Sequence, residues 1–407
     1  MPTIWKRNLM ALSFAQFVSI IGMSFFLPFI PLYLKELGLQ SDAEISTWSG
    51  VLFSAGFLML SLSAPLWGAW ADRFGRKPMV VRATGAASLV LFATAFVQTP
   101  SQLLVLRLVH GCFCGFVSSA IALIASETPE RSLSFALGLF QSALTAGFIV
   151  GPFFGGVLQD FYGIRLAIFI GACIVLCGAL LVWVFVREEH KPEKKDRSFS
   201  IWKNAEFLFK NSTLWPAARL QFVSNMSLMS VQPILALFVT FLAEASNPHI
   251  GTLAGLVVSA TALSMMVGAP FWGRMADRWS QRKVLTICLF MAGLTFIPQA
   301  MAQSVSFLFF SRFLLGFFSA GIAPSLQALI AKHTPTDRKA GVLGVSFSFT
   351  LMGNAVGPLL GGALAAALGL RIPFILTAVL LFIAGLMSRS LKIKLVKAPA
   401  TSLTQSD

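Results

Sequence analysis

Residues 64–77 read Ala-Pro-Leu-Trp-Gly-Ala-Trp-Ala-Asp-Arg-Phe-Gly-Arg-Lys, and much of this stretch returns at residues 269–278 as Ala-Pro-Phe-Trp-Gly-Arg-Met-Ala-Asp-Arg. In both copies an apolar run gives way to an Asp-Arg pair, first Asp72-Arg73 and later Asp277-Arg278. A duplication of this kind predicts two similar helical bundles related by an axis along the membrane normal, with a route between them.

Other residues repeat at nearly the same offset. Arg107 and Gly111 return as Arg312 and Gly316. The glycine-proline group returns almost in phase, and its members are Gly147, Gly151, Pro152, Gly155 and Gly156 in the first half and Gly353, Gly357, Pro358, Gly361 and Gly362 in the second. The repeat therefore extends over most of the chain.

The composition places most of the chain in a membrane. Of 407 residues, 56% are hydrophobic and 12% are charged, whereas about a quarter of a soluble protein is charged. A bilayer core of ~30 Å needs about 20 apolar residues per helix, and twelve such runs are present, at 9–34, 46–71, 79–97, 101–125, 132–158, 165–186, 214–243, 251–276, 284–302, 305–331, 340–366 and 372–391. We expect an all-α membrane protein with twelve transmembrane helices in two six-helix bundles with pseudo-two-fold symmetry.

The positive charge sets the orientation. Of the 31 lysines and arginines, Lys35, Arg165 and Arg371 fall on one side of the predicted membrane, and Arg107 and Arg312 fall deep within spans. The other 26 fall on the side of the two termini, either outside the spans or at the ends of spans on that side. This asymmetry follows the positive-inside rule, so we expect an inner-membrane protein with both termini in the cytoplasm. The net charge of +15 is then a topology signal, and nucleic-acid binding is not expected.

The expected organisation is a bundle over 1–187, a solvated cytoplasmic linker over 188–212, a second bundle over 213–397 and a disordered tail over 398–407. All five cysteines lie inside apolar runs, which argues against disulfides and redox motifs. His110 and Cys114 are accompanied by Cys112, which points away from them on a helix, so no metal site is expected. No cofactor is expected either.

Several motifs resemble those of the major facilitator superfamily, in particular its twelve-helix drug:proton antiporter branch. Within this branch, the chain is similar to small bacterial multidrug exporters. Residues 68–77 match the family's loop motif between the second and third helices at every position. Arg107 and Gly111 resemble its fourth-helix motif, and residues 147–156 resemble its antiporter motif on the fifth helix. Gly22, with Pro28 and Pro31, resembles its first-helix pattern.

The loop motif is expected to act as a latch that holds the outward-open state. Asp72 ends the second span, where a carboxylate can face the positive N-terminus of another helix, which in the family is the eleventh. Gly75 permits the turn, while Arg73 and Arg76 are expected to reach Glu127. The alternative is that the basic residues only fix topology. In the second half Ser280-Gln281 replaces the Gly-Arg pair, so the copy around Asp277 and Arg278 is expected to be weaker.

The glycines of the fifth span can have either of two roles, helix packing or a role in setting the direction of transport. Gly147, Gly151 and Gly155 recur every four residues, which clears one helical face for another backbone. Pro152 removes a backbone hydrogen bond and should bend the helix. A packing role would suffice for these glycines alone, but the extension through Gly156 resembles exporters of the family and favours export over import.

Charged and titratable side chains inside the predicted spans could couple proton movement to transport. Arg107 lies inside the fourth span, and an intramembrane charge costs at least about 2.5 kcal/mol, so it is functional by default. The resemblance implies a role in proton transfer. Arg312 could act similarly or only bond carbonyls, and His110 could titrate or simply pack. None of the sixteen acidic residues lies mid-span, unlike in many drug exporters, so a neutral or anionic substrate remains open.

Polar stripes suggest a cavity lining. Gln221, Asn225 and Gln232 share a face of the seventh span, and Gln16 lies on the first. Interhelical hydrogen bonding explains such stripes equally well.

The function expected from the sequence is a proton-coupled antiporter that exports hydrophobic small molecules or drugs by alternating access, works as a monomer in the lipid bilayer, and is not an enzyme. A dedicated exporter of an endogenous anionic metabolite such as a siderophore is the alternative. A polytopic membrane enzyme or sensor is the remote alternative, for which neither a catalytic cluster nor an effector domain is visible in the sequence.

Overall fold

The computed structural model describes residues 4–188, 201–243, 247–335 and 338–391. Within its helices only the backbone is described for Pro65, Gly68, Ala69, Asp72, Ser118, Glu130, Ser134, Ile201 and Ala340. The tail expected to be disordered, 398–407, lies outside the described residues.

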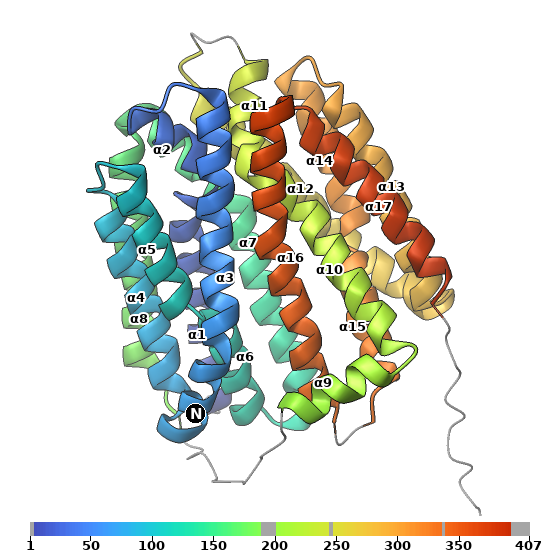
Figure 1. Cartoon of the computed structure of the whole chain (residues 1–407). Helices are drawn as coiled ribbons and strands as arrows, with labels where there is room; N and C mark the ends of the chain where they lie inside the picture. The colour runs from blue at the N-terminus through green and yellow to red at the C-terminus, as the bar shows by residue number, and fades with distance from the viewer. Residues whose placement is uncertain (1–3, 189–200, 244–246, 336–337, 392–407) are drawn as a thin grey trace, which may run out of the picture.

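The first half consists of α1 (Ile4–Ser24), η1 (Leu27–Phe29), α2 (Ile30–Glu36), α3 (Asp42–Phe74), α4 (Arg76–Thr94), α5 (Pro100–Phe113), α6 (Phe116–Glu127), α7 (Glu130–Tyr162) and α8 (Ile164–Phe185). The second consists of α9 (Ile201–Lys210), α10 (Leu214–Ser230), η2 (Gln232–Ile234), α11 (Leu235–Leu242), α12 (Ile250–Arg278), α13 (Gln281–Ala300), α14 (Val305–Ser319), α15 (Ile322–Lys332), α16 (Lys339–Leu368) and α17 (Ile372–Arg389). Figure 1 shows two bundles side by side.

Ten helical segments of the described chain are long and apolar enough to cross a bilayer. The two remaining crossings are α4, which carries Arg76, Lys77 and Arg82, and the α5–α6 pair, which is interrupted at Cys114 and Gly115. Both run beside the other helices of the first bundle. The described chain thus has the predicted all-helical, twelve-span fold, and the helix bounds lie within a few residues of the predicted spans.

The two halves repeat individual contacts as well as sequence. Trp67 Nε1 donates to the carbonyl oxygen of Cys112 at 2.6 Å, and Trp272 Nε1 donates to that of Phe317 at 2.8 Å. The first crossing of each half is broken by a short 3₁₀ turn, at Pro28 in one and Pro233 in the other, because proline lacks the N–H that a continuous helix needs.

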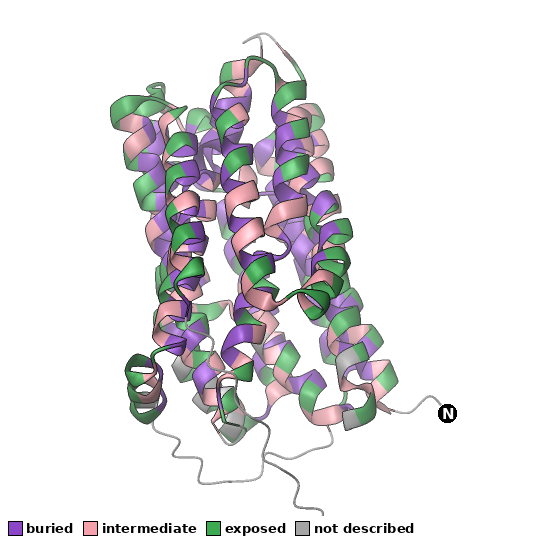
Figure 2. Ribbon diagram, turned by 90° about the vertical axis from the view of Figure 1, so that its right-hand side faces the viewer, coloured by how far each residue is buried: buried purple, intermediate pink, exposed green. Residues whose placement is uncertain are grey.

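The outer flanks of the bundles suit a lipid environment. Figure 2 shows exposed residues running along the sides of the helices, and they include large apolar side chains such as Leu89 and Phe310. In a bilayer these side chains face acyl chains, so their exposure carries no penalty.

The molecule has two ends, and each is named here after the parts of the chain that lie at it. The terminal face, lower in Figure 1, is where α1 begins and α17 ends, and the distal face is where α2 ends and α12 begins. The segment 188–212, predicted to be a solvated linker, contains the helix α9 at the terminal face.

A candidate transport pathway between the two halves

The halves meet along two helix pairs, α7 with α12 and α3 with α16. At the α7–α12 seam the backbones touch because both helices carry glycine there. A Cβ on Gly156 would collide with the carbonyl oxygen of Gly251, and one on Gly255 would collide with that of Pro152. All four residues lie in the distal third of their helices.

The α3–α16 seam is closed in the same way and at the same face. A Cβ on Gly50 would lie 2.6 Å from the carbonyl oxygen of Pro358, and one on Gly362 would lie 2.5 Å from that of Ser46. Figure 1 shows α3 and α16 drawing apart toward the terminal face. The halves are therefore held together at the distal face.

Asp160 adds a polar clasp to the distal face. Its Oδ1 accepts from the backbone N–H of Gly251 at 2.7 Å, and its Oδ2 accepts from the N–H and the hydroxyl of Thr252 at 2.7 and 2.6 Å. Asp160 ends α7 and its partners begin α12, so a carboxylate of one half caps a helix N-terminus of the other, where a negative charge is favoured.

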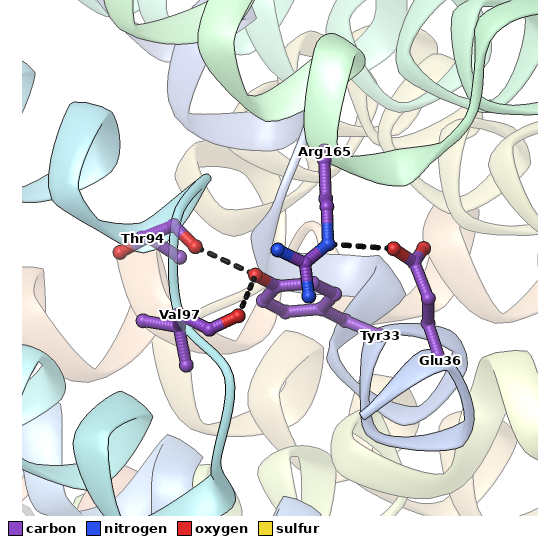
Figure 3. Close-up of polar contacts among 5 residues, drawn as sticks. All are labelled: Tyr33, Glu36, Thr94, Val97 and Arg165. Atoms are coloured by element: carbon purple, nitrogen blue, oxygen red, sulfur yellow. Dashed lines mark hydrogen bonds and ion pairs between the residues drawn. The ribbon is translucent and has the colours of Figure 1, made fainter. Parts of the chain in front are cut away.

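A second group of contacts braces the distal rim of the first half. Arg165 Nε lies 2.8 Å from Glu36 Oε1, and the Tyr33 hydroxyl donates to the carbonyl of Thr94 at 2.7 Å (Figure 3). The ion pair is about 40% exposed on both sides, so its own contribution is small. Its effect is to fix the end of α2 against the start of α8.

At the terminal face the loop motif forms a tight turn with an unpredicted partner. Gly75 has a φ of +96°, which glycine adopts without strain. Glu188 Oε1 and Oε2 accept from the backbone N–H groups of Arg76 and Lys77 at 2.8 and 3.0 Å. The first residues of the linker thus cap α4, although no role beyond a surface loop was expected for them.

The residues of the predicted latch have the following neighbours in the structure. The Arg76 guanidinium bonds the carbonyl of Ala122 on α6, the helix that ends at Glu127, while Arg73 lies 5.3 Å from the ring of Phe74. The side chain of Asp72 lies outside the described residues. In the second half, Asp277 and Arg278 are exposed and make no hydrogen bond or ion pair with the described part of the chain.

The two interior arginines have different surroundings. Arg107 is 7% exposed, and its Nε donates to the carbonyl of Leu52 at 3.1 Å. Its Nη2 occupies the space that a side chain at Gly56 would fill. Arg312 is 1% exposed, and its Nε and Nη2 have no hydrogen-bond partner among the described residues. Thr261 is the counterpart of Gly56 in the second half, since its carbonyl oxygen lies against Gly316 as that of Gly56 lies against Gly111.

With this geometry established, comparisons with known proteins identify the family. Matches to the model of the Major Facilitator Superfamily cover residues 12–248 and 220–404. The chain belongs to the Major Facilitator Superfamily. It is therefore a membrane transporter of small molecules rather than an enzyme, which confirms the resemblance seen in the motifs.

Curated superfamily relatives match over nearly their whole length. The chain is 34% identical over 376 residues to the "Uncharacterized MFS-type transporter YuxJ" of Bacillus subtilis, covering 92% of this chain and 95% of the relative. It is 32% identical over 378 residues to "Multidrug resistance protein MdtG" of Salmonella typhimurium, covering 93% of each.

Solved superfamily structures share the fold at low identity. The nucleoside transporter NupG has a TM-score of 0.80 at 15% identity and covers 95% of this chain and 100% of its own. A bacterial homologue of the human lysosomal transporter Spinster, solved facing inward and unoccupied, has a TM-score of 0.78 at 16% identity and covers 96% and 98%.

In this superfamily member the antiporter-like glycines have two different neighbours. Gly147 and Gly151 lie against α1 and Gly155 lies against the residue that follows it, and their Cβ atoms would meet Ile20, Ser24 and Phe25 at 2.6–2.9 Å. Gly156 faces α12 in the other half. The glycines spaced every four residues therefore pack α7 against its own bundle. The next glycine, Gly156, makes the contact between the two bundles.

The predicted cavity residues fall into two groups, those with a hydrogen-bond partner and those without one among the described residues. Gln221 bridges α10 to α16, since its Nε2 donates to Thr350 and its Oε1 accepts from Ser346, both at 2.6 Å. Asn225 donates to the carbonyl of Gln221 at 2.8 Å. The bonds of Gln221 support the interhelical alternative, whereas the bond of Asn225 lies within α10. Gln16 is fully buried with neither side-chain atom paired among the described residues, and Gln232 lies half-buried in η2. His110 is half-buried on α5, one turn from Arg107.

Proposed function

We propose that this transporter is a proton-coupled antiporter that exports hydrophobic small molecules, including drugs, by alternating access. The observation that carries the proposal is the α7–α12 seam, because the segment that resembles the antiporter motif is also the one whose Gly156 makes backbone contact between the halves. The relatives named multidrug resistance protein support the choice of substrate.

The proposed orientation places the terminal face in the cytoplasm and the chain in the inner membrane. The excess of lysine and arginine on that side supports it. The distal clasp then closes the outside, and the structure corresponds to an inward-facing state. In the opposite state the distal seam would open while the Asp72 latch, with Arg73, Arg76 and Glu127, would close the cytoplasmic side.

Arg107 is the proposed coupling residue, with His110 beside it. A guanidinium that is bonded to a carbonyl of α3 rather than to a carboxylate is a permanent positive charge in the interior of the first bundle. It can disfavour a proton on the neighbouring His110, and a change in the separation of the two side chains between states would couple proton movement to the transport cycle. The monomer contains all of these groups, so we propose that it is the functional unit.

Efflux from everted vesicles tests this function. Drug uptake into the vesicles should require an imposed proton gradient, and Arg107→Ala should reduce it at least tenfold. Uptake that persists undiminished after both the proton gradient and the electrical potential are removed would refute proton coupling. Arg187→Gln, an exposed charge outside the spans, serves as the control for loss of a positive charge.

A second function, export of an endogenous anionic metabolite, is favoured by Arg312. This buried guanidinium has donors without a partner among the described residues, and no acidic residue that the structure describes lies in the middle of a membrane-crossing helix. An anionic substrate would supply the missing counter-charge. Deletion of the gene should then lower one extracellular anion while leaving drug tolerance unchanged, and Arg312→Gln should reproduce that loss.

A further inference from the structure

Helix α9 has no role in the transport cycle proposed above. It covers Ile201–Lys210 and lies at the terminal face, across the ends of the bundle helices rather than among them (Figure 1). It contacts α10 and α16. Its sequence, Ile-Trp-Lys-Asn-Ala-Glu-Phe-Leu-Phe-Lys, mixes aromatic and charged residues in a pattern that gives it three distinct sides.

The first side of α9 is packed against the bundle. Asn204 and Leu208, four residues apart, are buried. A Cβ on Gly341, in the first turn of α16, would collide with the amide of Asn204, so the two helices touch there. The Arg338 guanidinium, just before α16, lies 5.4 Å from the ring centre of Phe207. The helix is therefore fixed to the beginning of α16.

The second side is aromatic and bare. Trp202 is 84% exposed and Phe209 is 50% exposed, and at 100° per residue the two point within about 20° of each other. The Phe209 ring lies 4.8 Å from that of Trp215, which begins α10, and Trp215 lies 5.7 Å from Phe349 of α16. The aromatic side thus continues onto the flank of the membrane-spanning helices.

The third side is charged. Lys203, Glu206 and Lys210 are exposed, about 40–100° around the helix from Trp202. Lys210 Nζ lies 2.5 Å from Glu206 Oε1, one turn earlier, which leaves Lys203 as the exposed positive charge next to the tryptophan.

We propose that α9 lies in the bilayer interface on the terminal side, with Trp202 and Phe209 in the headgroup and acyl boundary and with Lys203 against anionic phospholipid headgroups. An indole is amphipathic and concentrates at this boundary, and a helix with one packed, one aromatic and one basic side fits a membrane surface. The continuity of the aromatic side with Trp215 places that side at the edge of the lipid-facing flank. Anionic lipids attract nearby lysines and so complement the charged side.

The docked helix would link the bilayer to the moving half. Because Asn204 is packed on Gly341, α9 and the first turn of α16 move together. The start of α16 would then keep a fixed depth at the membrane surface while the bundles rock.

Spin-label accessibility in the full chain tests the docking. Trp202→Cys and Lys203→Cys, each in a background without the five native cysteines, are labelled with a nitroxide and placed in nanodiscs containing phosphatidylglycerol. We expect the label at 202 to collide more with oxygen, which concentrates in lipid, and the label at 203 to collide more with a water-soluble nickel chelate. Equal access of the nickel chelate to both positions would overturn the proposal and would mean a solvent-exposed helix, available to a protein partner instead.

The charge component has its own test. Replacing phosphatidylglycerol by phosphatidylcholine should raise nickel access at position 202 at least twofold, and Lys203→Gln should do the same without changing the lipid. Depth at position 202 that is identical in both lipids would overturn the anionic-lipid part. Size-exclusion profiles that match those of the parent chain show that each variant is folded, and neither readout depends on transport, so failure here is separate from failure of the proposed function.

Discussion

At the scale of single residues, the absence of a side chain at Gly156 is what brings the two halves together. Even one methyl group there would collide with the backbone oxygen of Gly251, and a backbone atom cannot rotate out of the way as a side-chain tip can. Gly138, on the same helix, has no atom within 4 Å of a built Cβ. The two glycines therefore form a matched pair.

Gly156→Ala should weaken distal closure and reduce transport at least tenfold, whereas Gly138→Ala should leave transport within twofold of wild type. A tenfold change in the closed fraction corresponds to about 1.4 kcal/mol, which a collision with a backbone atom readily supplies. Vesicle uptake with both variants at equal expression measures this. Equal activity of the two variants would show that the seam is not needed.

Asp160 is the polar counterpart of this contact. Hydrogen bonds to a charged acceptor contribute about 1.5–3 kcal/mol each, so the clasp is strong enough to bias the equilibrium between states. Asp160→Asn should therefore favour the distal-open state, seen as increased alkylation of a cysteine introduced at the buried Ser46. Glu44→Gln, an exposed acid at the same face, is the control. Unchanged alkylation in Asp160→Asn would contradict the clasp.

At the scale of elements, helix N-termini recur as the points where carboxylates act. Asp160 caps α12 across the halves, and Glu188 caps α4 within one half. The proposed Asp72 latch would use the N-terminus of α16 in the same way. Asp160 and Glu188 both belong to segments distant in sequence from the helices that they cap, so helix packing brings these two pairs together.

Glu188→Gln should loosen the loop motif by about 1 kcal/mol, the usual cost of losing a helix cap. The expected result is a small decrease in the melting temperature together with faster proteolysis between α3 and α4. Glu206→Gln, whose partner is an exposed lysine one turn away, should change neither quantity. If both variants behave alike, the cap contributes no local stability.

At the scale of the whole molecule, alternating access requires the distal seam to open during every cycle. The double variant Asp160→Cys with Thr252→Cys places two thiols where carboxylate and hydroxyl now lie 2.6 Å apart. Oxidation should lock the seam and abolish transport, and a reducing agent should restore it to the level of the unoxidised double variant. Full activity in the oxidised protein would exclude rocking about this seam.

Much of this architecture was predictable from the sequence. Apolar runs long enough to cross a bilayer predicted the spans, because lipid leaves a helix few other ways to satisfy its backbone. The Gly75 turn and the face cleared by Gly147, Gly151 and Gly155 were also predictable, since both depend on local spacing. In contrast, α9 is too short and too polar to register as a span, and its helical form depends on packing against α16.

The sequence by itself determined the number of crossings, the repeat and the segments with close-approach glycines, because these follow from hydropathy and from period. Only the tertiary structure decided that Asp160 meets α12 and that Glu188 caps α4. It also decided that Arg107 is bonded to a carbonyl, while Arg312 has donors with no partner in the part of the chain that the structure describes. Those outcomes depend on which helix ends and carbonyls become neighbours although they lie 55 to 112 positions apart in the chain. Local sequence patterns do not specify contacts between residues so far apart.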